Sequence, residues 1–291
     1  MIKDFKYLAP KTLKEALSLL DKYQDECKVI AGGQSLLVLM KQGLVAPTYL
    51  IDIKGLSELS YIKSDAKGGL RIGALTTHRA IEKSAVIQKK FSVLAEMEKR
   101  LASIQTRNWG TIGGNICHGE PAGDPAPVLI ALNATLSMAS VKGKRNMAME
   151  DFSLDYFETA LEPGELLTEI QVPAIPPHTG AAYTKFNIIE SDLATVGVAV
   201  SITLRSGDGV CQDVRIALGA SAPTPIRAKQ AEKILRGKKI TDNLLQDAGE
   251  KAAAEAEPIS DIAASADYRR ELIKVLVKRM GKEALSRAKQ A

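Results

Sequence analysis

The chain has 291 residues, of which 45% are hydrophobic and 25% charged, a composition typical of a folded protein long enough for two domains. Its 39 basic and 34 acidic residues are scattered along the sequence without a basic stripe interleaved with aromatic residues, so the charge of +5 does not indicate nucleic-acid binding. No run approaches the roughly 18 apolar residues of a membrane helix, and the N-terminus lacks the apolar core of a secretion signal, so we expect a cytoplasmic protein without a membrane span.

The first 55 or so residues predict a small α/β unit. A T-x-x-E capping box of Thr12 and Glu15 opens an amphipathic helix. A short β-like run at 28–31 ends at a pair of glycines, an apolar helical segment follows at 36–41, and the alternating run at 49–53 predicts another strand.

A second unit begins after a glycine turn. It contains a predicted strand at 70–75 and a mainly helical segment at 81–101. The stretch 105–127 shows no periodicity and is rich in Gly, Pro, Asn and Asp, which predicts a functional loop. Predicted strands at 134–141 and 167–172 close the unit.

The breaker PAIPPH at 173–178 marks the expected boundary between two domains. Beyond it, strands are predicted at 194–204 and 213–218, and two helical stretches rich in Ala, Lys and Glu follow. The last third therefore has an α+β pattern.

Two glycine pairs carry the chemistry, in AGGQS at 31–35 and TIGGN at 111–115. Consecutive glycines can adopt backbone angles that let several peptide N–H groups converge on one anion, and the helix after the first pair adds its positive end. A diphosphate would fit there. Neither pair has the G-x-G-x-x-G spacing of a Rossmann fold, and each pair taken alone is also explained by a tight turn.

A specific resemblance connects these blocks. The sequences at 31–53, 71–78 and 111–134, together with those at 192–202 and 217–232, are similar to the FAD-binding (medium) subunit of the xanthine dehydrogenase and carbon monoxide dehydrogenase family of molybdenum hydroxylases. The order and spacing of the blocks match, and the resemblance covers nearly the whole chain.

The resemblance implies an α+β fold with two domains. Residues 1–175 would form a two-lobed FAD-binding domain of the vanillyl-alcohol-oxidase (PCMH) type, with lobes at about 1–55 and 56–175. Residues 179–291 would form a smaller α/β C-terminal flavoprotein domain of the carbon monoxide dehydrogenase type.

The resemblance also implies a set of FAD-binding residues and no catalytic or metal-binding residue. The FAD diphosphate and ribityl chain would be held by Ala31, Gly32, Gly33, Gln34 and Ser35 and by Thr111, Ile112, Gly113, Gly114 and Asn115. Asp124 would hydrogen-bond the cofactor, Leu101, Leu167 and Lys185 would flank it, and Leu193 would lie over the flavin ring, with aliphatic packing where some relatives have an aromatic residue.

The implied function is electron transfer. FAD in this chain would pass electrons from two [2Fe-2S] clusters on a small partner subunit to an external acceptor, while a large molybdopterin subunit hydroxylates the substrate. A dimer of such heterotrimers is expected. Cys27, Cys117 and Cys211 form no close pair, which agrees with clusters held elsewhere. The alternatives are a self-sufficient FAD-dependent oxidoreductase and a binding protein that has lost its flavin; the substrate and the acceptor stay open.

Four residues near the loops invite other interpretations. His78 and His118 could act in acid–base chemistry, although a structural hydrogen bond explains His78 and a contact with FAD or a partner explains His118. Cys117 beside His118 could form a nucleophilic pair, but neighbouring side chains in an extended loop point to opposite faces. Trp109 is expected in core or interface packing, or stacked on the cofactor.

Overall fold

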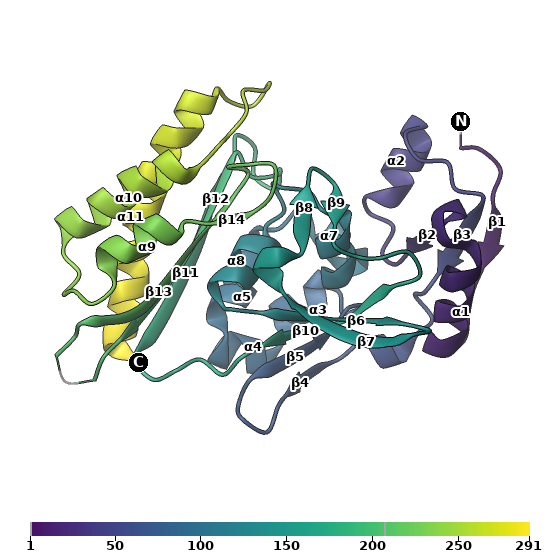
Figure 1. Ribbon diagram of the computed structural model, residues 1–291, viewed down its shortest axis with the longest axis horizontal. Coiled ribbons are helices and arrows are strands. Elements are labelled where there is room, and N and C mark those ends of the chain that lie inside the picture. Colours follow the sequence, from purple (N-terminus) through teal and green to yellow (C-terminus); the bar gives the residue numbers. More distant parts are fainter. Residues whose placement is uncertain (1, 207) are drawn as a thin grey trace.

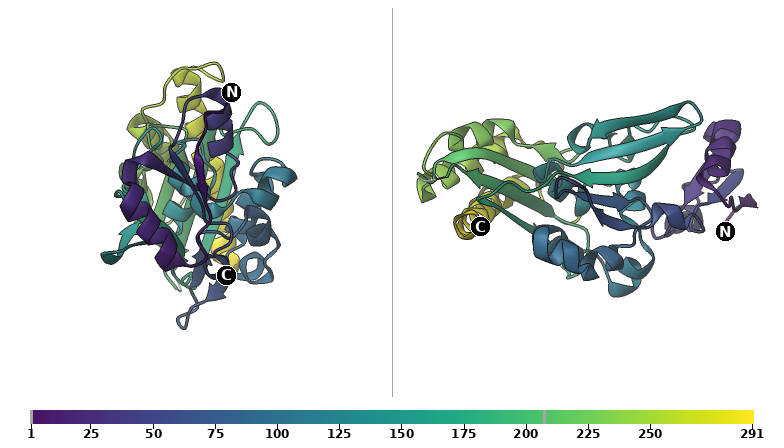
Figure 2. Two further views of the ribbon diagram at one scale, coloured as in Figure 1. Left: turned by 90° about the vertical axis from the view of Figure 1, so that its right-hand side faces the viewer. Right: turned by 90° about the horizontal axis from the view of Figure 1, so that it is seen from below.

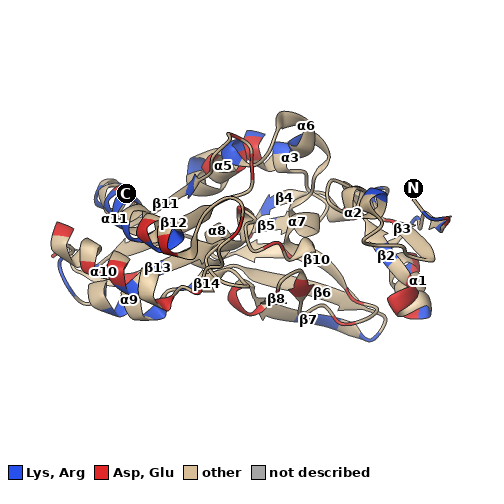
Figure 3. Ribbon diagram, turned by 90° about the horizontal axis from the view of Figure 1, so that it is seen from above, with Lys and Arg blue, Asp and Glu red and all other residues tan. Residues whose placement is uncertain are grey.

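The computed structural model describes residues 2–206 and 208–291 and places three parts in a row. An N-terminal lobe and a C-terminal domain lie at opposite ends, with a central lobe between them (Figure 1). The view from below gives the same order (Figure 2). Basic and acidic residues are interspersed along the outer helices (Figure 3). No helix within the described ranges is long and apolar enough to cross a membrane.

The N-terminal lobe is a parallel sheet with crossover helices, which agrees with the small α/β unit that the sequence predicts. Strand β3 lies between β1 and β2 and runs parallel to both. The elements are β1 (Lys6–Leu8), α1 (Leu13–Tyr23), β2 (Cys27–Ile30), α2 (Leu36–Gln42) and β3 (Tyr49–Asp52). The Thr12 side chain caps α1 by accepting from the Glu15 N–H at 3.2 Å, and the Glu15 carboxylate accepts from the Lys11 N–H at 2.7 Å. The predicted N-terminal cap is confirmed.

The central lobe contains a five-stranded antiparallel sheet in the order β4-β5-β10-β6-β7. Its strands are β4 (Ile62–Ser64), β5 (Leu70–Gly73), β6 (Thr135–Ser140), β7 (Gly143–Ala148) and β10 (Leu166–Val172), and a separate hairpin is formed by β8 (Ser153–Asp155) and β9 (Glu158–Thr159). Its helices are α3 (His78–Lys83), α4 (Ala85–Lys90), α5 (Ser92–Arg100), α6 (Ile104–Trp109), α7 (Ile112–His118) and α8 (Pro125–Ala131).

The segment 105–127 is not the irregular loop that its composition predicts. It holds most of α6, all of α7 and the start of α8. The Ser103 hydroxyl caps α6 and the Thr111 hydroxyl caps α7, each by accepting the N–H three residues on. Helices of six or seven residues are too short to show a 3.6-residue repeat, and packing stabilises α7 despite its two glycines. The helical prediction for 81–101 holds, but the segment is divided into α3, α4 and α5.

The C-terminal domain is a four-stranded antiparallel sheet covered by helices on one face. Its elements are β11 (Thr179–Phe186), β12 (Val196–Leu204), β13 (Cys211–Gly219), β14 (Ile226–Arg227), α9 (Lys229–Leu235), α10 (Asp242–Glu255) and α11 (Ala266–Gln290). Along β12, Val198 and Val200 pack toward the helices, whereas Ala199 between them belongs to the core of the central lobe. This alternation joins the two domains through a shared face of the sheet. Helix α8 packs against that face, on β12 and β13.

Candidate cofactor site

A cavity of about 870 Å³ runs past both glycine loops and reaches the C-terminal domain. Fourteen of the fifteen residues that the sequence assigns to the cofactor line it. They are Ala31, Gly32, Gly33, Gln34, Ser35, Leu101, Thr111, Gly113, Gly114, Asn115, Asp124, Leu167, Lys185 and Leu193. The volume falls in the range of about 300–1,000 Å³ that small-molecule and cofactor sites have.

Ile112 is the residue that the structure leaves out of this cavity. Its side chain is fully buried in the core of the central lobe, among Ala74, Leu129 and their neighbours. In the first turn of α7 consecutive side chains point about 100° apart, so the glycines after Ile112 can face the cavity while Ile112 faces the core. Its side chain thus faces away from the cavity, and its role as a cofactor-binding residue stays a prediction.

The first glycine loop touches the two residues just before the second loop. A Cβ atom on Gly32 would lie 2.1 Å from the carbonyl oxygen of Trp109 and 2.8 Å from the Cα atom of Gly110. Only glycine permits this approach, because any side chain would collide with backbone rather than with a flexible group. Gly32 therefore explains how segments some 80 residues apart come to form one wall of one cavity.

The loops differ in what their backbone N–H groups do. In the first loop, the N–H groups of Gly32, Gly33, Gln34, Ser35 and Leu36 donate to no other group among the described residues. The Ser35 side chain does not cap α2. Converging backbone N–H groups at the start of a helix form an anion site, so this loop fits a diphosphate.

The second loop uses its N–H groups within the protein. Ile112 donates to the Thr76 carbonyl at 3.1 Å, Gly113 donates to the Ala74 carbonyl at 2.9 Å, and Gly114 donates to the Thr111 hydroxyl at 3.1 Å. Backbone N–H groups without an acceptor among the described residues are thus found at the first loop, where their convergence on a diphosphate stays a prediction. Thr111, Gly113, Gly114 and Asn115 of the second loop still line the cavity.

A buried ion pair closes the far end of the cavity. The Lys185 ammonium donates to the Asp124 carboxylate at 2.8 Å and to the Asp192 carbonyl at 2.8 Å, and the Tyr183 hydroxyl donates to the other Asp124 oxygen at 2.5 Å. Burial raises the pKa of the Asp124 carboxyl and Lys185 opposes that rise. Each carboxylate oxygen can accept more than one hydrogen bond, so Asp124 keeps the capacity to bind a ligand in the cavity.

The residues that suggested other chemistry have structural partners. His78 is buried, and its Nδ1 lies 2.9 Å from the Glu98 carboxylate, so the structural explanation is confirmed. The His118 ring packs on Phe157 with centroids 5.3 Å apart. Burial raises the pKa of the Cys117 thiol to about 12 and removes its nucleophilic form at neutral pH. Cys117 and His118 lie on α7, not in an extended loop. Trp109 is 62% exposed, so core packing is wrong for it.

Sequence reasoning missed the apolar part of the site. Val29, Leu36, Leu39 and Val45 line the cavity beside the first loop, and Phe157 lines it near the other end. Val29, Leu36 and Leu39 resemble ordinary core positions of a strand and a helix, Val45 lies in the connection between α2 and β3, and Phe157 lies at the tip of a hairpin. No sequence signal distinguishes them from packing residues. Within residues 2–206 and 208–291, no three His, Cys, Asp or Glu side chains gather as ligands for a metal ion.

Comparison with known proteins gives the family. Residues 3–175 match the model described as the FAD binding domain in molybdopterin dehydrogenase, and residues 181–284 match the CO dehydrogenase flavoprotein C-terminal domain. The chain belongs to this family of flavoprotein subunits. The resemblance seen in the sequence is therefore confirmed, as is the two-domain FAD-binding fold, and this family member is an oxidoreductase subunit with an FAD-binding domain.

The relatives are medium chains of dehydrogenases. The chain is 36% identical to the glyceraldehyde dehydrogenase medium chain of Sulfolobus acidocaldarius over 96% of this chain and 98% of the relative. It is 38% identical to the carbon monoxide dehydrogenase medium chain of Hydrogenophaga pseudoflava over 94% and 95%. A solved structure of the latter enzyme superposes with a TM-score of 0.95 over 99% of each chain. The similarity thus extends along both domains.

Proposed function

We propose that this chain is the FAD-carrying electron-transfer subunit of a molybdenum hydroxylase complex. It would take electrons from [2Fe-2S] clusters on a small partner subunit and deliver them to an external acceptor, while a large molybdopterin subunit transforms the substrate. The continuous cavity, with an anion site at one end and a buried polar pair at the other, is the observation that carries the proposal. We further propose a dimer of heterotrimers in the cytoplasm and domains at 1–175 and 179–291.

Different parts of the cavity suit different parts of FAD. The unpartnered N–H groups of residues 32–36 would bind the diphosphate, and the apolar slot formed by Val29, Leu39 and Val45 would take an uncharged ring next to it. Bound FAD would supply a ring that accepts and releases electrons. This chain would position that ring and exclude water from it.

At the other end, the chain's own side chains would set the surroundings of the ring. Leu101, Leu167 and Leu193 would pack against apolar surface, and Asp124 would accept a hydrogen bond from the cofactor. Lys185 would hold Asp124 ionised as a hydrogen-bond acceptor, and the pair as a whole would add no net charge to this end of the cavity.

Purification of the affinity-tagged chain from its native host tests the proposal. We expect one bound FAD per chain, two copurifying subunits, and molybdenum and iron in the complex. The isolated chain should hold FAD and be reduced by dithionite, yet oxidise none of the organic substrates that the complex oxidises. Turnover of such a substrate by the isolated chain, at the rate of the complex, would instead support the self-sufficient oxidoreductase.

A further inference from the structure

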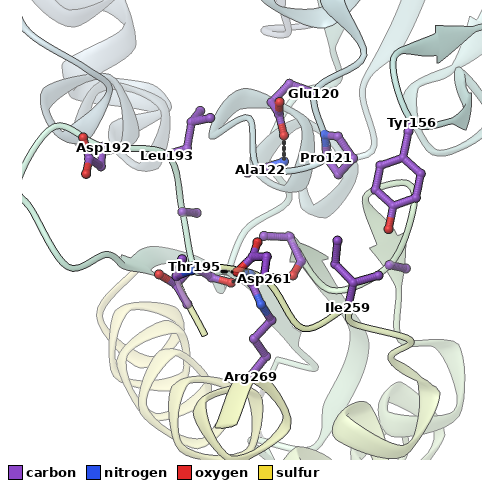
Figure 4. Close-up of a pocket in the computed structure, with 14 residues that line it drawn as sticks. Glu120, Pro121, Ala122, Tyr156, Asp192, Leu193, Thr195, Ile259, Asp261 and Arg269 are labelled. Carbon is purple, nitrogen blue, oxygen red and sulfur yellow. Dashed lines mark hydrogen bonds and ion pairs between the residues drawn. The ribbon is translucent and has the colours of Figure 1, made fainter. Parts of the chain in front are cut away.

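A second pocket of about 410 Å³ lies where the two domains meet. The central lobe contributes Glu120–Ala122 and Tyr156, and the C-terminal domain contributes Thr195, Ile259 and the Asp261–Arg269 pair. Figure 4 shows the residues of the central lobe across the pocket from those of the C-terminal domain, with Asp192 and Leu193 to one side.

This pocket shares a wall with the cofactor cavity. Asp192 and Leu193 line both spaces, and the Lys185 ammonium fixes that wall by donating to the Asp192 carbonyl. A molecule in the pocket would therefore lie next to the end of the cavity that holds Asp124 and Lys185. Leu193 is 59% exposed and forms this shared wall together with Asp192.

The charges around the pocket disfavour an anionic ligand. Arg269 is the one basic residue among the described residues that line it, and both of its contacts with the Asp261 carboxylate measure 2.7 Å. Arg269 also donates to the Thr195 carbonyl. Glu120 and Asp192 therefore keep negative charge that no lining cation balances, and a cleft lined by one sign of charge repels ligands of that sign. A dinucleotide, which carries a diphosphate, does not suit this pocket.

Two hydroxyl groups give the pocket its hydrogen-bonding character. Neither the Thr195 hydroxyl nor the Tyr156 hydroxyl bonds to another described residue, although Thr195 is only 3% exposed. A hydroxyl can donate to a carbonyl and can also accept from a hydroxyl. It therefore suits a ligand that alternates between a ketone and an alcohol form. Pro121, Ala122 and Ile259 supply apolar surface for the rest of such a ring.

We propose that this pocket binds an uncharged quinone ring as the electron acceptor, between the Tyr156 and Thr195 hydroxyls and beside the Leu193 wall. The inference rests on the proposed function, because the reduced cofactor of that function supplies the electrons. In the step, the two quinone carbonyls gain two electrons and two protons and become the two hydroxyls of the quinol. Reduced FAD loses the same two electrons and two protons, so atoms and charge balance.

The test uses the FAD-loaded full-length chain and a water-soluble probe, 2,3-dimethoxy-5-methyl-1,4-benzoquinone. Calorimetry gives its Kd, and stopped-flow spectroscopy gives the rate at which it reoxidises the dithionite-reduced chain. The variants Thr195→Val and Tyr156→Phe each remove one hydroxyl and should weaken binding about five- to tenfold, the usual worth of one hydrogen bond. Ala222→Trp should fill the pocket and abolish binding.

Controls separate this inference from the proposed function. Tyr268→Phe removes an exposed hydroxyl of α11 that does not line the pocket, so the Kd for the quinone should not change. Every variant should retain FAD and be reoxidised by ferricyanide at the wild-type rate. If the Ala222→Trp variant retains FAD and reacts with ferricyanide, yet binds the quinone with the same Kd as the wild-type chain, the pocket assignment is wrong. The quinone proposal would also be overturned if the wild-type chain bound NAD and the Ala222→Trp variant did not. Loss of FAD from the wild-type chain would contradict the proposed function instead.

Discussion

The Asp124–Lys185 pair gives a quantitative prediction. Both side chains are buried, with exposed fractions of 5% and 3%, and Lys185→Met removes the cation while Asp124 stays in place. Breaking a buried ion pair on one side typically costs about 3–5 kcal/mol, because the remaining charge is left without a partner. The variant is therefore expected to lose stability of this size at neutral pH.

The pH dependence follows from the Asp124 carboxyl. Burial already raises its pKa, and the loss of Lys185 removes the main influence that lowers the pKa. A carboxyl with a raised folded pKa stabilises the fold below its unfolded pKa and costs stability as pH rises toward the folded value. The variant can avoid a buried charge by protonating Asp124, which costs about 1.4 kcal/mol per pH unit above an ordinary pKa of about 3.9. The expected loss is thus limited to about 4 kcal/mol at pH 7 and about 1.5 kcal/mol at pH 5.

Thermal unfolding at saturating FAD measures this effect. At pH 7 the midpoint of Lys185→Met should fall on the order of 10 °C, and at pH 5 by less than half as much. Lys282→Met is a matched control because its pair with Asp242 is exposed, and it should cost less than about 1 kcal/mol at either pH. Adding Asp124→Asn to Lys185→Met should remove the pH dependence. Equal losses at pH 5 and pH 7 would refute the reasoning.

Three further predictions concern the second glycine loop and helix α7. In Gly114→Ala the new Cβ meets only the Thr111 hydroxyl closely, at 2.9 Å. The fold should therefore lose about 1 kcal/mol from a disturbed helix cap, while FAD should bind at least about tenfold more weakly. In the contrasting variant Gly113→Ala, the new Cβ would lie 2.6 Å from Ala74, so this region should unfold, as circular dichroism would show. Ile112→Ala should cost about 2–5 kcal/mol in denaturant unfolding with unchanged FAD affinity of the folded chain, and weaker binding would restore Ile112 to the site. The Cys117 thiol lines the cavity and is only partly buried, but its pKa is raised to about 12, so it should resist iodoacetamide at pH 8 in mass spectrometry; rapid labelling would contradict the raised pKa.

Four elements of the N-terminal lobe, α1, β2, α2 and β3, could be predicted from the sequence because each has its own signal, whereas the three-residue strand β1 was not predicted. The Thr12 cap and the period of α1 are examples. Strand β11 was not predicted, since its sequence TGAAYTKF contains small residues where alternation would need large ones. Gly180 in that strand lies against α11, where a Cβ would meet the Ala284 carbonyl at 2.1 Å. A contact between distant segments determined that residue, and no local pattern records it.

The resemblance selected residues that line one cavity in the structure, because it carries the three-dimensional arrangement of a whole family. That these residues bind FAD stays a prediction. The motif includes Ile112 because the order of residues in a sequence does not show that this side chain faces the core. The difference between the loops also required the structure, because the acceptors for the second loop, Ala74 and Thr76, lie in another segment.

The unpartnered N–H groups of the first loop have a consequence for the life of the protein in the cell. Until an anion binds there, five consecutive peptide groups depend on water, although an apolar cluster that includes Leu17, Ile51, Leu59 and Leu166 already joins the N-terminal lobe to the central lobe. A ligand that binds only the folded state adds stability in proportion to the logarithm of its concentration. Vitamin supply should therefore govern the abundance of this chain: in riboflavin-starved cells, we expect proteases to remove newly made copies before they can assemble.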